Sequence, residues 1–194
     1  IGDGALMSSL AGTSNIAIGY AALNTINNNN DNIAIGTGAG QAENTAAGTN
    51  SKNIFIGSGA AQNVVAGSKN IAIGFQALQG AIGSGFGNTI AIGDSTLKNV
   101  TTGNNNIAIG IGIAQGITSG GSNIFIGGVG NNVVTQGGNT VVGQSTAITG
   151  DFSGCVLLGF GTSASGSNAI NIGGNGITVP ANNCNIGTSL TTTT

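Results

Sequence analysis

The stretch Asn70-Ile71-Ala72-Ile73-Gly74 is a clear copy of the motif that decides the fold. The same five residues recur at 15–19, 32–36 and 106–110, and the copies at 53–57 and 123–127 differ in a central Phe. Thr replaces Asn in the copy at 89–93, and weaker copies end at Gly143, Gly159, Gly173 and Gly187. Successive copies lie 14 to 21 residues apart. Self-similarity at such a period is typical of a repeat architecture.

Each copy has the pattern of a short β-strand. Its first and third residues share one face, and both are β-branched or aliphatic almost throughout. Because of this apolar character, we expect them to form the solenoid core. These residues are Ile16, Ile18, Ile33, Ile35, Ile54, Ile56, Ile71, Ile73, Ile90, Ile92, Ile107, Ile109, Ile124, Ile126, Val142, Leu158, Ile172 and Ile186.

The chain is therefore predicted to be an all-β, parallel β-solenoid of about eleven coils. Gly ends each strand where a corner needs freedom in φ, and a second apolar segment follows, as at 64–65 and 77–78. One coil cannot bury enough apolar surface to be stable, so stability comes from stacking. We expect a lead-in or fragment edge at 1–13, the repeat domain at 14–187 and a tail at 188–194.

The middle residue of each strand points away from the first and third. It is apolar in most copies, and a strand that is apolar on both faces is normally buried on both. We therefore expect these middle residues to form a subunit interface; the alternative is that small Ala is tolerated at a wetted position. They are Ala17, Ala34, Phe55, Ala72, Ala91, Ala108, Phe125, Val141 and Leu157.

Asn precedes the strand in eight copies. Stacked Asn side chains can form amide ladders between neighbouring coils, whereas Asn also suits a turn by itself. The sequence leaves both interpretations open. The residues are Asn15, Asn32, Asn53, Asn70, Asn106, Asn123, Asn139 and Asn183.

The last repeats, CVLLGFGTSASGSN at 155–168 and AINIG at 169–173, resemble the head repeats of YadA-type trimeric autotransporter adhesins. Earlier repeats, such as NIAIGYAAL at 15–23 and NIAIGFQAL at 70–78, are similar to repeats of phage and large-virus tail fibres. The resemblance implies a left-handed β-roll, a homotrimer, and attachment to a host-surface receptor or glycan. It also implies an extracellular location, on a bacterial surface or a virion fibre. The period of 14 to 21 is more variable than in an adhesin head.

Composition argues against catalysis and against nucleic-acid binding. The chain has no His, three Lys or Arg, and five Asp or Glu that lie in different repeats. His is a common general base and metal ligand, and nucleic-acid binding needs clustered cations. Neither a GxGxxG run nor a periodic Asp is present. We expect no catalytic residue, no cofactor, no metal site, and no membrane span, since Gly and Asn interrupt every apolar stretch.

We therefore expect a non-catalytic structural segment of a fibre or adhesin, forming a trimeric shaft or head for surface attachment, and two other functions compete with this one. An ice-binding solenoid needs a flat array of small or Thr side chains, which the Ala column partly supplies, although Phe55 and Phe125 interrupt it. A carbohydrate-acting enzyme needs paired carboxylates about 5–10 Å apart.

Within the fibre hypothesis, receptor contacts are expected on the long loops 22–32 and 40–53. Cys155 and Cys184 are too far apart in the stack for an expected disulfide.

Overall fold

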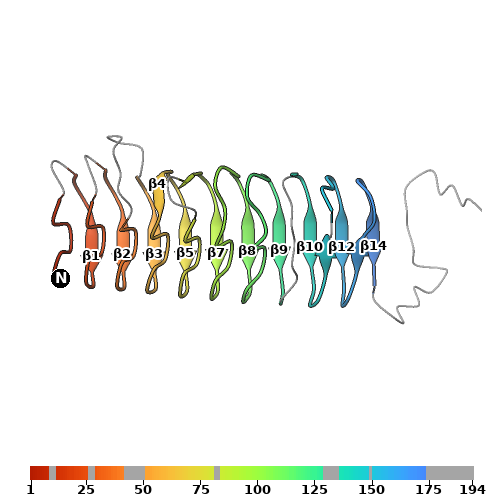
Figure 1. Ribbon diagram of the computed structural model, residues 1–194, viewed down its shortest axis with the longest axis horizontal. Helices are drawn as coiled ribbons and strands as arrows, with labels where there is room; N and C mark the ends of the chain where they lie inside the picture. The colour runs from red at the N-terminus through yellow and green to blue at the C-terminus, as the bar shows by residue number, and fades with distance from the viewer. Residues whose placement is uncertain are drawn as a thin grey trace, which may run out of the picture.

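The protein is a parallel β-solenoid in which successive coils stack along one axis (Figure 1). The computed structural model describes residues 1–8, 12–25, 29–41, 51–80, 84–128, 136–148 and 150–173, and this part of the chain contains no helix. Its strands are β1 (Ile16–Ile18), β2 (Ile33–Ile35), β3 (Ile54–Ile56), β4 (Val64–Ala66), β5 (Ile71–Ile73), β6 (Ser84–Gly85), β7 (Ile90–Ile92), β8 (Ile107–Ile109), β9 (Ile124–Ile126), β10 (Thr140–Val142), β11 (Ala147–Ile148), β12 (Val156–Leu158), β13 (Ser163–Ala164) and β14 (Ile170–Ile172).

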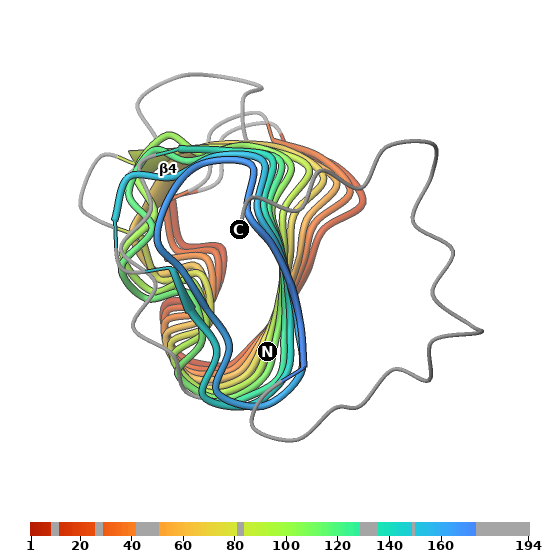
Figure 2. The same cartoon turned by 90° about the vertical axis from the view of Figure 1, so that its right-hand side faces the viewer.

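Ten of these strands form one parallel sheet, in the order β1-β2-β3-β5-β7-β8-β9-β10-β12-β14. Every pair is in phase, so that Ile71 lies beside Ile90 and Ala72 beside Ala91. Two smaller parallel pairs, β4–β6 and β11–β13, belong to the rest of the coil. Viewed along the axis, the coils overlie one another (Figure 2). The predicted class of parallel β-solenoid is thus confirmed for the described residues.

Stacking begins earlier in the chain than the expected boundary at residue 14. The backbone N–H of Gly19 donates to the carbonyl of Ile1 at 2.7 Å, and that of Ala21 donates to Asp3 at 2.9 Å. In return, the N–H of Ser8 donates to Asn24 at 2.9 Å. Residues 1–8 are therefore part of the stack. The copy ending at Gly187 and the tail at 188–194 lie outside the described residues.

The coil interior is formed by the middle residue of each strand, which reverses the prediction for the two strand faces. Ala72 is fully buried, whereas Ile73 on the same strand is 36% exposed. The burial pattern is the same in the strands of the ten-stranded sheet from β1 to β12, with the middle residue buried and both neighbours exposed or half-buried. The physical reason is that side chains from the rest of the coil fill the same buried cluster, so that a small Ala suffices at most levels of the strand column.

The second apolar segment supplies most of the bulk inside the coil. Its buried side chains include Leu23, Leu78, Leu97, Ile113 and Ile117, all at most 2% exposed. These residues follow the strand-ending Gly and belong to the same buried cluster as the Ala column.

The interior also adapts to a large middle residue where one occurs. A Cβ on Gly40 would lie 2.8 Å from ring atom Cδ2 of Phe55 and 2.8 Å from Cδ2 of Leu23. Gly40 occupies the position that Leu23 holds in its own coil, as the bond from Leu23 N–H to Ala39 and that from Gly40 N–H to Ala60 show. The missing side chain makes room for the Phe55 ring in the next coil.

The strand-ending Gly is required by its backbone angle and by crowding along the axis. Gly36 has φ of +133°, and a Cβ there would lie 2.6 Å from the carbonyl carbon and oxygen of Gly57 in the next coil. An L-residue would overlap the neighbouring backbone as well as being strained. The predicted role of this Gly as a corner residue is confirmed, and the axial contact adds a second reason.

The Asn residues before the strands form a ladder between coils. The side-chain oxygen Oδ1 of Asn106 accepts bonds from the backbone N–H of Asn123 at 3.0 Å and from its Nδ2 at 3.1 Å. Asn106 Nδ2 donates to the carbonyl of Gly120 at 2.8 Å, which ties the strand to the loop of the next coil. Of the two open interpretations, the amide ladder is confirmed for the described residues.

Candidate assembly surface

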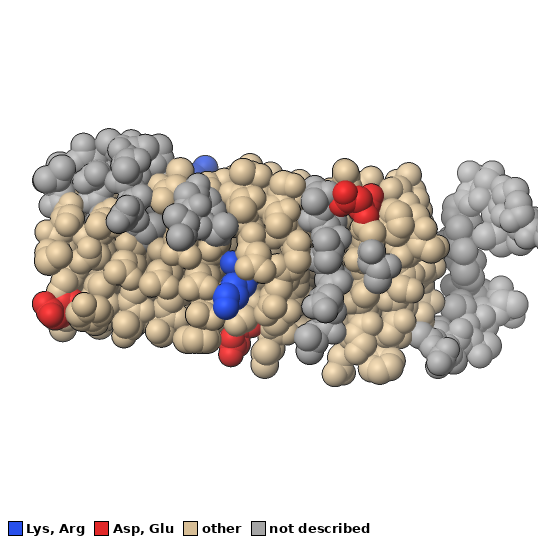
Figure 3. Space-filling view, in the orientation of Figure 1, with Lys and Arg blue, Asp and Glu red and all other residues tan. Residues whose placement is uncertain are grey.

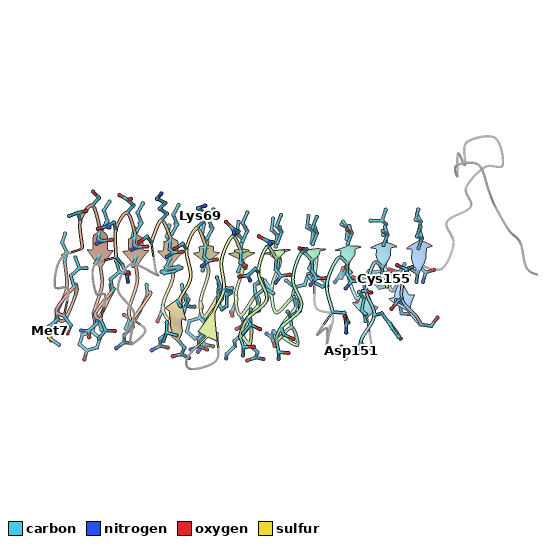
Figure 4. All side chains as sticks on the ribbon, turned by 90° about the horizontal axis from the view of Figure 1, so that it is seen from above. Met7, Lys69, Asp151 and Cys155 are labelled. Atoms are coloured by element: carbon cyan, nitrogen blue, oxygen red, sulfur yellow. The ribbon has the colours of Figure 1, made fainter. Side chains whose placement is uncertain are left out.

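The first and third strand residues form two apolar columns on the outer side of the ten-stranded sheet. No described member of either column is buried. Figure 4 shows a row of side chains projecting from these strands away from the coil interior. The most exposed members are Ile16 49%, Ile18 40%, Ile35 37%, Ile56 36%, Ile73 36%, Ile109 38%, Ile124 36%, Ile126 39%, Ile170 68% and Ile172 61%. We call these two columns the Ile stripe.

The Ile stripe is long, regular and continuous. Ten in-phase strands at about 4.8 Å spacing make it about 43 Å long. The two columns are separated by two residues of extended chain, or about 7 Å. An apolar surface of several hundred Å² on one face of a chain is at the upper end for soluble monomers and marks an interaction site.

Charge is sparse around this surface. The space-filling view shows the opposite side of the rod, where a few isolated acidic and basic groups lie among uncharged residues (Figure 3). Lys52 and Lys69 sit two residues before their strands, in the left-handed conformation with φ of +63° and +62°. Lys98 Nζ donates to Oε1 of Gln76 at 2.8 Å. The stripe itself consists of aliphatic residues and Thr140, so contact with it depends on apolar burial.

The structure places both sets of predicted residues on the opposite side from that expected. The nine residues predicted as a subunit interface, Ala17, Ala34, Phe55, Ala72, Ala91, Ala108, Phe125, Val141 and Leu157, are 0–6% exposed inside the coil. The predicted interface is therefore wrong. The predicted core is also wrong, because its described members form the Ile stripe. Ile186 lies outside the described residues.

Side-chain size is the signal that would have separated the two faces. The middle column alternates between Ala and an occasional larger residue, and Gly40 accompanies Phe55 in the adjacent coil. Such local exchange of volume is a property of a packed interior. The outer columns hold Ile at almost every level without any matching change nearby, as an external contact surface allows.

A second group of exposed apolar side chains follows the strand-ending Gly. Tyr20 is 61% exposed, Phe75 52%, Ile111 68% and Phe160 66%. At the same position the other coils carry polar residues such as Thr37 and Ser58. These side chains are therefore separated from one another along the axis and do not form a continuous stripe.

The carboxylates of the described residues are dispersed. Asp3 and Asp94 occupy equivalent positions, as the bonds from Ala21 N–H to Asp3 and from Gly112 N–H to Asp94 show. Five coil spacings separate them, which is about 24 Å. Within the described part of the chain, no group of three His, Cys, Asp or Glu could hold a metal ion. Glu43 lies outside the described residues.

Cys155 takes the place of Asn in the ladder. It is buried and free, and its backbone N–H donates to Oδ1 of Asn139 at 2.9 Å. Its thiol Sγ donates to the carbonyl of Gly166 at 3.3 Å, as an Asn amide would. Cys184 lies outside the described residues.

The remaining predicted features are only partly covered. Of the long loops 22–32 and 40–53, positions 26–28 and 42–50 lie outside the described residues. The described residues include no helix of the length and hydropathy that a membrane span needs.

No family model matches the chain, and neither the curated proteins nor the solved structures include a significant match.

Proposed function

We propose that this chain is a non-catalytic structural segment of a fibre or head, in which identical chains pack against one another through the Ile stripe. The observation that carries the proposal is the stripe itself, two columns along all ten strands of the main sheet in which Thr140 is the one polar residue. A surface of that extent is covered in a stable assembly. The interior of the coil is already filled, and no described residue buries the stripe, which supports a cover by a second chain.

A second copy of the chain fits this surface better than an unrelated partner. The side chains of the stripe repeat at the strand spacing of about 4.8 Å. A copy carries the same repeat, so its Ile residues can interdigitate with these at every level. The lack of charge on the stripe makes the contact independent of electrostatic matching. Covering the exposed two-fifths of a side chain such as Ile18 or Ile126 contributes about 0.6–1.2 kcal/mol per residue.

The finer features of the proposal come from the resemblance to adhesin heads and tail-fibre repeats. They are three chains around a common axis, a left-handed coil, about eleven coils including the copy at 183–187, and display on a bacterial surface or virion. In this arrangement each Ile stripe faces the axis. The loops 22–32 and 40–53 then extend from the assembly, where they contact a receptor or glycan.

The ice-binding alternative required the Ala column to form an exposed flat array. The Ala column is buried in the coil and cannot touch ice. The exposed columns contain Ile at most levels, and no observation favours ice over a second chain.

The decisive measurement is the molar mass in solution by light scattering after size-exclusion chromatography. The chain has a mass of 18.5 kDa, and we expect an assembly of three times that value. Replacing Ile73, Ile92 and Ile109 together with Thr keeps the β-branched shape and removes apolar area from three adjacent coils. This variant should dissociate to the single chain or to a concentration-dependent mixture.

A matched control is the double replacement of Phe75 and Ile111 with Thr. Both side chains are more exposed than the three that are replaced, Ile73, Ile92 and Ile109, but they lie outside the strands. The control should keep the mass of the parent chain. A folded monomer for the parent chain, or equal dissociation of both variants, would show that the Ile stripe is not the assembly surface.

A further inference from the structure

A cluster of polar side chains surrounds Gly59, on the turns that follow the strands β3, β5 and β7. A Cβ at Gly59 would lie 3.5 Å from Cγ of Gln76, 3.6 Å from Oε1 of Gln62 and 3.9 Å from Nε2 of Gln79. Gln79 Nε2 donates to Gln62 Oε1 at 3.1 Å, and Lys98 Nζ donates to Gln76 Oε1 at 2.8 Å. Side chains from three neighbouring coils therefore meet at this point of the surface.

The bonds within the cluster leave two amide atoms without a partner. In the described part of the chain, no hydrogen bond reaches Nε2 of Gln76 or Oε1 of Gln79. Both side chains are half-buried, and the bond at the other amide atom holds each of them in place. The cluster therefore offers one oriented donor and one oriented acceptor to a ligand.

An exposed aromatic ring adjoins the cluster. Phe75 directly precedes Gln76 and is 52% exposed. Asp94 is the equivalent residue of the next coil, as the bond from Ser95 N–H to the carbonyl of Phe75 at 2.8 Å shows. The Asp94 side chain is exposed, and its Oδ1 accepts from Ser95 Oγ at 2.7 Å. Single exposed rings are common on soluble proteins, but this ring has hydrogen-bonding groups beside it in its own coil and in the next.

The cluster lies on the side of the rod away from the Ile stripe. Met7 is related to Gly4 as Gln62 is to Gly59, because each backbone N–H donates to the carbonyl three residues earlier, at 3.4 and 3.2 Å. Figure 4 shows Met7 on the side opposite the row of side chains that projects from the strands. Assembly through the Ile stripe would leave this side accessible.

The chemistry of the cluster fits a neutral saccharide. A sugar ring has an apolar face of C–H groups that stacks on an aromatic ring, and its hydroxyls both donate and accept hydrogen bonds. Phe75 supplies the aromatic face, Gln76 Nε2 the donor, and Gln79 Oε1 and the Asp94 carboxylate the acceptors. The single Lys98 is offset by Asp94, so the cluster lacks the grouped cations that a phosphate-rich ligand requires.

The repeat favours a chain of sugars over a single one. Equivalent positions recur about every 4.8 Å along the rod, which is close to the length of one sugar unit in an extended β-linked polysaccharide. Gln41 Oε1 extends the carboxamide series by accepting from Gln62 Nε2 at 3.1 Å. Thr37 and Ser58, both exposed, place hydroxyls in the column of Phe75. An extended polysaccharide aligned with the rod can thus place successive sugars over successive coils.

We propose that the turns around Phe75, Gln76, Gln79 and Asp94 form a binding site for a neutral, extended polysaccharide. One sugar ring stacks on Phe75, while its hydroxyls bond to Gln76 Nε2, Gln79 Oε1 and the Asp94 carboxylate. This site goes beyond the proposed function, which places ligand contacts on the loops 22–32 and 40–53. It does not depend on assembly, because Phe75 is exposed in the single chain.

Isothermal titration calorimetry of the full chain with defined oligosaccharides tests the site. The probes are β-linked hexasaccharides of glucose, mannose, galactose and N-acetylglucosamine, with a heparin hexasaccharide as the anionic comparison. We expect at least one neutral probe to bind and heparin not to bind. The proposal is overturned if no neutral probe binds, or if heparin alone does.

Substitutions locate the binding of the neutral probe. Phe75→Ala should weaken it about ten-fold, because the stacked ring is lost, and Gln76→Leu about five-fold, because the donor is lost. Phe160→Ala is the matched control: Phe160 is 66% exposed at the equivalent position of its coil, but Gly161 follows it in place of Gln76. This control should bind as the parent chain does. Full binding by Phe75→Ala, or an equal loss in Phe160→Ala, contradicts the proposal.

Light scattering on the same samples separates this site from the proposed function. A parent chain that is monomeric but binds the probe would refute assembly through the Ile stripe and retain the saccharide site. A parent chain that assembles but binds no neutral probe would refute the saccharide site alone.

Discussion

The assignment of the strand faces predicts opposite effects for two adjacent residues of β9. Phe125 is fully buried between Ala108 and Val141 of the neighbouring strands, whereas Ile124 is 36% exposed. The backbone ladder holds the coils at a fixed spacing, so they cannot close over a missing ring. Phe125→Ala should therefore cost about 3–5 kcal/mol of unfolding free energy, and Ile124→Ala about 1–2 kcal/mol.

The assay is chemical denaturation followed by circular dichroism. It is performed in the background that carries Thr at 73, 92 and 109, so that contacts between chains do not contribute to the Ile124 value. Phe125→Leu, which retains most of the apolar volume, should cost less than half as much as Phe125→Ala. If Ile124→Ala is the more destabilising of the two, the interior has been assigned to the wrong face.

Two further predictions concern the corner and the ladder. Gly110→Ala should cost at least about 3 kcal/mol, because the added Cβ would overlap the carbonyl oxygen of Gly127 in the next coil and strain a φ of +147°. Gly161→Ala is its control, since φ is +65° there but nothing lies within 4 Å; it should cost only about 1–2 kcal/mol, and similar melting temperatures for the two variants would exclude axial crowding as a cause. Cys155→Asn should raise the unfolding free energy by about 1 kcal/mol, because the new amide can replace the thiol bond to Gly166 and extend the ladder by one level. A lower denaturation midpoint than that of the parent chain would count against this role.

Much of the local structure could be predicted from the repeat. The alternation in Ile71-Ala72-Ile73 indicates a strand, and Gly74 indicates the corner that follows it. Constant spacing from Asn to Gly within the motif places equivalent residues side by side in neighbouring coils, as the in-phase pairs of the sheet confirm. The Asn column could be recognised as well, although a turn and an amide ladder require the same residue.

The candidate site could be located in the strands but not assigned to the correct face. A period of two residues separates the faces of a strand, and it carries no information about which face is inside. The expectation that large aliphatic residues fill the interior is sound for a thick core, and it placed Ile73 inside and Ala72 outside. The observed exposures of 36% and 0% are the reverse.

The sequence by itself determined that this chain stacks short parallel strands, where each strand begins and ends, and which residues form columns. These features depend on local spacing and backbone conformation, which a repeat displays directly. Only the tertiary structure decided which column lies inside. That choice depends on which other side chains fill the interior, and these include Leu78 and Leu97 from the segment after the strand. With those side chains in the interior, a small Ala suffices as the middle residue at most levels, and the Ile stripe faces outward.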